Sequence, residues 1–101
     1  MISSHIQFNE KQIEEFCKKR KIAEFAFFGS VIRSDFRPDS DVDVLVTFAA
    51  DAHWSLWDLV DMQDELKTMF GRKVDLVQKA GIRNPFRKKH ILENMKIIYV
   101  A

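Results

Sequence analysis

Helix-type and strand-type hydrophobic patterns alternate along this chain of 101 residues, and that alternation limits its possible folds more than any other feature. The predicted order is helix, strand, strand, helix, strand, helix, strand. The strands fall at residues 22–28, 42–48, 73–77 and 96–100, while Asn9 and Ser55 cap two helices and Pro85 opens the third. Helices interleaved with strands predict an α/β (α+β) fold in a single small domain, 1–101, with a mixed β-sheet and helices packed against it. The connection between the first two strands has little regular structure, so the sheet must contain an antiparallel pair.

Composition excludes several classes of protein. Hydrophobic residues make up 47% of the chain and charged residues 31%, which is typical of a folded globular domain rather than a disordered one. Sixteen basic and fifteen acidic residues leave a net charge of +1, so no overall field attracts polyanions or an anionic membrane. No apolar segment has the length of a signal peptide or a membrane span. The single cysteine, Cys17, cannot form an internal disulfide and is expected to fill the core, so we expect a cytoplasmic protein.

Two carboxylates occupy one face of the second predicted strand. Asp41 and Asp43 are two residues apart, and side chains at that spacing point to the same side of a strand. Such a pair repels itself unless a positive charge lies between. A divalent cation is the natural candidate, and ligands that are all oxygen favour Mg²⁺ or Mn²⁺ over zinc.

A possible phosphate-binding segment ends the first predicted strand. Gly29 lets a ligand approach the backbone closely, and a short helical turn after it would offer free N–H groups. The hydroxyl of Ser30 adds a donor, and Arg33 could pair with a phosphate oxygen. A phosphate cradle beside a two-carboxylate metal site is what phosphoryl or nucleotidyl transfer requires.

A third carboxylate, Asp75, lies within the third predicted strand. Its apolar neighbours predict that the strand buries it, and a buried aspartate needs a partner. A metal ion shared with Asp41 and Asp43 would supply one. A salt bridge to Lys73 or Arg72 is the structural alternative.

The pattern Gly29-Ser30, ten residues, Asp41-x-Asp43 and a later Asp75 resembles the polymerase β-type nucleotidyltransferase superfamily, and the short chain resembles its minimal nucleotidyltransferase (MNT) branch. The resemblance implies a polymerase β-like fold that transfers AMP from ATP to a hydroxyl. It implies that Asp41 and Asp43 bind two Mg²⁺ ions (Mn²⁺ is possible). Asp75 would complete one metal site and help deprotonate the acceptor. Gly29 and Ser30 would hold the β,γ-phosphates of the NTP, and Arg33 would assist.

The resemblance also implies a partner. Members of the minimal branch are commonly encoded beside a small all-helical HEPN protein, as the antitoxin of a toxin–antitoxin pair. The implied activity is adenylylation of a tyrosine on that HEPN toxin, as in a type VII-like system, within a hetero-oligomer. The alternative is a non-catalytic binding module that masks a partner ribonuclease. Transfer to RNA or to a small molecule is a third hypothesis, disfavoured because the chain has little room for an acceptor-binding domain.

Charge and aromatic residues are unevenly distributed. Residues 77–91 contain no acid but six basic or titratable side chains, whereas residues 51–65 contain five acids and no Lys or Arg. Two solvated helix faces would explain this pattern. It could also steer a charged partner, and RNA binding by the basic segment is a weaker interpretation. Trp57, at the start of the acidic helix, is either a core residue or an interface anchor.

Overall fold

The computed structural model describes residues 8–32 and 40–101, and the elements follow the predicted order. Three α-helices, four strands and two short 3₁₀ turns are present in this part of the chain. Their bounds are α1 Glu10–Lys19, β1 Ile22–Phe28, η1 Gly29–Ile32, β2 Val42–Phe48, α2 Leu56–Phe70, β3 Val74–Gln78, η2 Lys79–Gly81, α3 Pro85–Asn94 and β4 Lys96–Val100. The third strand begins and ends one residue later than predicted.

The four strands form one mixed sheet in the order β3-β2-β1-β4. β1 pairs antiparallel with both β2 and β4, while β2 and β3 are parallel. The predicted antiparallel pair is therefore confirmed. A parallel pair needs a crossover connection, and α2 supplies it between β2 and β3. The ends of β3, β2 and β1 that carry Asp75, Asp43 and Phe28 thus meet at one end of the sheet.

Each helix begins at a side-chain cap. The carboxamide of Asn9 accepts hydrogen bonds from the first turn of α1, and that of Asn84 does the same for α3. Ser55 caps α2, as the sequence predicts, and forms a reciprocal capping box with Asp58. Gly71 ends α2 in the left-handed conformation.

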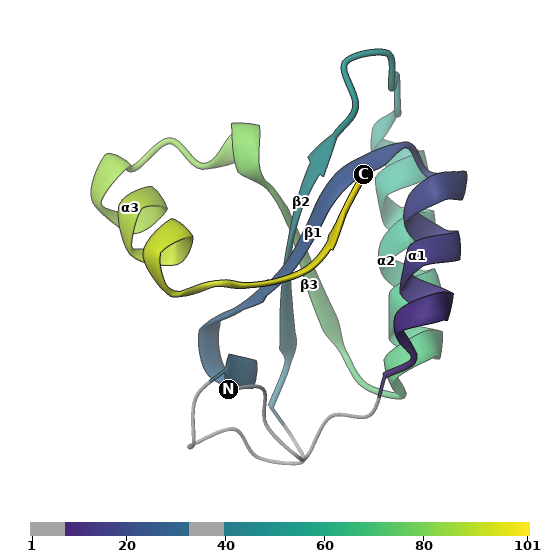
Figure 1. The fold of residues 1–101 in the computed structure, drawn as a ribbon, viewed down its shortest axis with the longest axis horizontal. Helices are drawn as coiled ribbons and strands as arrows, with labels where there is room; N and C mark the ends of the chain where they lie inside the picture. The colour runs from purple at the N-terminus through teal and green to yellow at the C-terminus, as the bar shows by residue number, and fades with distance from the viewer. Residues whose placement is uncertain (1–7, 33–39) are drawn as a thin grey trace.

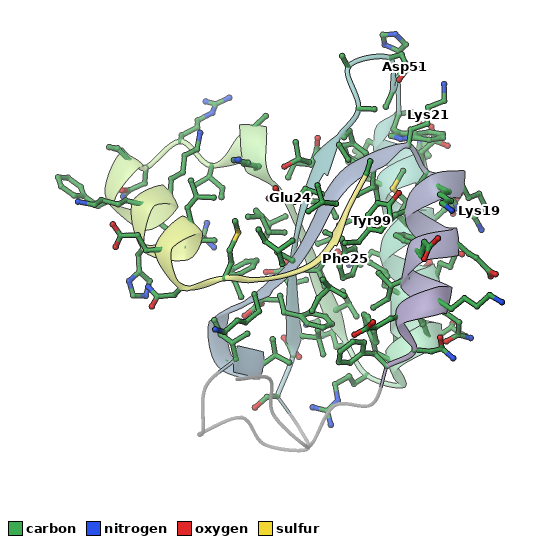
Figure 2. All side chains as sticks on the ribbon, viewed as in Figure 1. Lys19, Lys21, Glu24, Phe25, Asp51 and Tyr99 are labelled. Carbon is green, nitrogen blue, oxygen red and sulfur yellow. The ribbon has the colours of Figure 1, made fainter. Side chains whose placement is uncertain are left out.

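The two faces of the sheet carry different layers. Figure 1 shows α1 and α2 together on one face and α3 on the other. The alternation of side chains is visible on β1 in Figure 2, where Phe25 points toward α1 and α2 and Glu24 points to the α3 side. The larger core lies under α1 and α2, and Cys17 is fully buried in it, as predicted. A smaller core on the opposite face joins Phe28 and Leu45 to Ile91 of α3.

The basic residues at the end of α1 contact other elements of the fold. Lys19 and Arg20 both contact Glu65 of α2, at 2.7 and 3.2 Å, and only 19% of the Arg20 side chain is exposed. Arg20 also accepts a hydrogen bond on its carbonyl from Nε1 of Trp54. Lys19 and Lys21 lie at the surface, and Lys21 approaches Asp51 at 3.4 Å (Figure 2). The contacts with Glu65 join the end of α1 to α2.

The structure decides between the two alternatives for Trp57. This side chain is 78% exposed, and its neighbours Leu56 and Val60 are 72% and 45% exposed, so Trp57 is not a core residue. In the described parts of the chain, no helix has both the length and the apolar character needed to cross a membrane.

Candidate active site

Two of the three predicted carboxylates lie directly opposite each other. Asp43 of β2 pairs with Asp75 of β3 in the parallel ladder, which places their Cα atoms about 5 Å apart on the same face of the sheet. Asp41 directly precedes β2, and the backbone N–H of Val42 bonds to the carbonyl of Lys73 at 2.9 Å. The ladder therefore reaches the residue next to Asp41 in sequence, so all three aspartates come from one end of the β2–β3 pair.

Asp43 and Asp75 face the α3 side of the sheet. Val42, Val44 and Val74 belong to the core under α1 and α2, so Asp43 and Asp75 point the other way, with Leu45 and Val77. At this end of the sheet the α3 side is open. Asp43 is half-buried, but Asp75 is exposed.

The predicted burial of Asp75 is therefore wrong. β3 is an edge strand, and at its start only one face is covered by other parts of the protein. Val74, on that face, is buried, and Asp75, on the other face, is not. The apolar neighbours of Asp75 belong to opposite faces of the strand and cannot enclose it. The register with Asp43, rather than burial, is what associates Asp75 with the site.

Gly29 is in contact with Asp43. Phe28, the last residue of β1, pairs with Asp43, and Gly29 follows with a φ of 71°. An ideal Cβ built on Gly29 would overlap the Oδ2 atom of Asp43. The chain thus brings together the glycine and the aspartate that the sequence motif connects. Ser30 is half-buried in η1, and Arg33 lies outside the described residues.

A pocket of about 520 Å³ adjoins this glycine on the α3 side of the sheet. Its apolar lining includes the buried side chains of Phe28 and Ile91, and its polar lining includes Arg87, His90 and Lys96. These polar residues were not among the predicted site residues. Arg87 and His90 belong to the basic segment that the sequence analysis noted, but the sequence alone does not show that α3 turns them toward Gly29.

The carboxylates of this site are ligands of the kind that Mg²⁺ prefers. The donor set is all oxygen, and the register of β2 and β3 holds two of the carboxylates as neighbours, which suits this ion. Within residues 8–32 and 40–101, however, no three His, Cys, Asp or Glu side chains are gathered closely enough to hold a metal. The backbone fits a carboxylate-bound metal, and side-chain rotation on that backbone would have to complete the ligand set.

The fold is that of a nucleotidyltransferase. The profile of the nucleotidyltransferase domain family matches residues 10–98, nearly the whole chain, and the chain belongs to this family.

Individual relatives agree with this assignment. The chain is 30% identical to Protein adenylyltransferase MntA of Thermococcus cleftensis over 99 residues, which cover 98% of this chain and 92% of the relative. Among solved structures it is similar to a toxin–antitoxin crystal structure with AMP-PNP (TM-score 0.75, 21% identity, 93% of this chain and 75% of that one). It is also similar to a tri-AMPylated HEPN toxin in complex with an MNT antitoxin from Shewanella oneidensis (TM-score 0.66, 19% identity, 91% and 70%). At these identities the two structures establish the fold.

Proposed function

We propose that this chain transfers AMP from ATP to a hydroxyl of a partner protein, and that the partner is a small, all-helical HEPN-type toxin. The observation that carries the proposal is the contact of Gly29 with Asp43, which in turn lies opposite Asp75. It joins the phosphate-binding and carboxylate parts of the sequence motif in one place. The names of the similar proteins, an adenylyltransferase and an AMPylated toxin complex, support the choice of donor and acceptor.

In this proposal the acceptor is a tyrosine hydroxyl. Its oxygen attacks the α-phosphorus of ATP, a new oxygen–phosphorus bond forms, and the bond from the α-phosphorus to the bridging oxygen of the β-phosphate breaks. Pyrophosphate leaves, and Asp75 accepts the hydroxyl proton. Because Asp75 is exposed, a tyrosine on another protein can reach it.

Asp41, Asp43 and Asp75 would hold Mg²⁺, and Gly29 and Ser30 would hold the β,γ-phosphates. When bound, Mg²⁺ supplies positive charge for the phosphates. The absence of a Cβ at Gly29 leaves the Asp43 carboxylate in place and gives the phosphate chain access to the backbone. The proposal includes Arg33, which would assist in holding the phosphates. It also includes a cytoplasmic location for the protein.

The second candidate is a binding module that masks a partner without catalysis. The exposed apolar side chains of Leu56, Trp57 and Val60 on α2 favour it, because a surface patch of this kind is typical of protein–protein contacts. Both functions can coexist in one protein. The experiment must therefore separate label transfer from partner binding.

The test incubates the purified protein with ATP labelled at the α-phosphate, Mg²⁺ and a lysate of its source cells. The double variant Asp41→Asn with Asp43→Asn runs beside it. Its matched control is Asp61→Asn with Asp64→Asn, which makes the same chemical change on two exposed residues of α2. We expect a protease-sensitive labelled band that disappears only in the first double variant.

Other outcomes would change the assignment. Ribonuclease-sensitive label would show that the acceptor is RNA. Label in a small molecule would support the hypothesis that the acceptor is a small molecule. Undiminished labelling by the Asp41/Asp43 variant would contradict the catalytic role of these carboxylates. No label from a folded protein that still captures the HEPN partner would favour the binding module.

A further inference from the structure

The pocket beside Gly29 carries two positively charged side chains in its lining. Arg87 reaches it from α3 and Lys96 from the first residue of β4, and His90 of α3 also lines it. Glu93 is the acidic side chain in its lining. Gly29 lines the pocket and also contacts Asp43, so the pocket directly adjoins the carboxylates.

The register of the sheet shows how the charged residues are ordered across one end of it. Asp75 pairs with Asp43, and Asp43 pairs with Phe28 at the end of β1. On the other side of β1, Phe27 pairs with Lys96. One end of the sheet therefore runs from carboxylates on β3 and β2, through the β1 end that leads into Gly29, to the start of β4, where Lys96 lines the pocket.

The phosphates of a nucleoside triphosphate can follow the same order, from the carboxylates to the basic residues. The α-phosphate must lie beside the carboxylates, where transfer occurs, and the β- and γ-phosphates extend away from the acceptor. With the α-phosphate at Asp43 and Asp75, the outer phosphates pass Gly29 and enter the pocket. Arg87 offers a planar fork of N–H donors for phosphate oxygens, and Lys96 offers a compact positive charge.

We propose that Arg87 and Lys96 bind the β- and γ-phosphates of ATP and, after transfer, the leaving pyrophosphate. This inference rests on the proposed nucleotidyl transfer and adds its leaving-group site. Positive charge at this place stabilises the negative charge that develops on pyrophosphate as the bond to the α-phosphorus breaks. The buried Phe28 and Ile91 form a rigid lining from which the charged side chains extend.

The test compares nucleotides that differ only in their outer phosphates. Binding of ATP and of AMP, each with Mg²⁺, is measured by calorimetry on the whole chain and on the double variant Arg87→Gln with Lys96→Gln. The matched control is Arg83→Gln with Lys67→Gln, which removes one Arg and one Lys that are exposed and do not line the pocket. Circular dichroism checks that each variant folds.

We expect the Kd for ATP to rise at least about tenfold in the pocket variant, equivalent to about 1.4 kcal/mol, while the Kd for AMP changes less than about twofold. Pyrophosphate should displace labelled ATP from the unmodified protein and from the control. In the pocket variant it should be a weaker competitor.

Three results would overturn the inference: unchanged ATP affinity in the pocket variant, an equal loss for ATP and AMP, or an equal loss in the control. A failure of the proposed function is a different result. If the unmodified protein binds ATP, the pocket variant loses that affinity, and no AMP is transferred, the phosphate contacts stand and the transferase activity does not.

Discussion

Gly29 and Asp43 approach each other so closely that a side chain on the glycine would occupy the space of the carboxylate. An ideal Cβ on Gly29 would overlap Oδ2 of Asp43 and lie 3.1 Å from its Cγ. Gly29 also has a φ of 71°, in the left-handed region that disfavours other residues. Two independent physical reasons thus require glycine here, and one of them involves a residue of the candidate site.

Gly29→Ala should therefore damage activity more than stability. The left-handed conformation costs an alanine about 1–2 kcal/mol. The new methyl group must also displace the Asp43 carboxylate, so AMP transfer should fall by about two orders of magnitude. Thermal unfolding and transfer of label from ATP measure the two effects.

The control for this variant is Gly71→Ala. Gly71 has nearly the same φ, 69°, but an added Cβ would meet no atom within 4 Å. The backbone strain is thus reproduced without the steric overlap, and activity should remain. Equal loss of activity in both variants would show that strain or unfolding, and not displacement of Asp43, explains the effect.

Asp75→Asn should lower AMP transfer without lowering stability. Asp75 is exposed on an edge strand, so replacing its carboxylate with an amide removes no buried interaction. As a proton acceptor it would account for about two or more orders of magnitude in rate. Transfer rate and melting temperature are compared with those of Asp61→Asn on α2. Normal transfer by Asp75→Asn would exclude it from the mechanism.

The sequence predicts the elements of this fold well, because each is marked by local chemistry. Ser55 and Asp58 identify the start of α2 before any tertiary contact is known, and Gly71 marks its end. The strand order β3-β2-β1-β4 was not predicted. It depends on how the helices pack across the sheet, which no local pattern encodes.

The candidate site residues named from the sequence are those that share one turn or one strand end. Gly29 and Ser30 share a turn, and Asp41 and Asp43 lie at the start of β2. The exposure of Asp75 was not predictable, because it depends on β3 lying at the edge of the sheet. The proposed roles of Arg87 and Lys96 depend on α3 and β4 meeting near Gly29, which is a tertiary relationship.

Glu65→Gln should lower the free energy of unfolding at pH 7. It should also make that free energy fall less as the pH is lowered. Burial acts to raise the pKa of Glu65, but hydrogen bonds from Lys19 and Arg20 outweigh it and hold the pKa below its usual 4.5. A lowered pKa stabilises the folded state at pH values above the unfolded pKa, and this stabilisation is lost as pH falls below about 4.5. The glutamine variant should lose about 1 kcal/mol at pH 7 and less at pH 3.

Urea denaturation at pH 7 and pH 3 measures this difference. Glu14→Gln is the control, because Glu14 pairs with Lys18 at 2.8 Å within α1 and both side chains are largely exposed. Its loss should be smaller, since exposed pairs on one helix contribute little and join no second element. A loss for Glu65→Gln that did not depend on pH would contradict the electrostatic explanation.

The last prediction concerns Cys17, which is fully buried among the core residues under α1 and α2. Burial raises the pKa of its thiol from 9.0 to about 12. Between these values the unfolded chain releases the thiol proton and the folded chain retains it, so stability falls as pH rises through this window. The native thiol should react with iodoacetamide at pH 8 only as fast as the protein opens, whereas in urea it should react at once. Between pH 9 and pH 10.5, Cys17→Ala should lose stability less steeply than the unmodified chain. Rapid alkylation of the native protein would show that Cys17 is accessible and would contradict its burial.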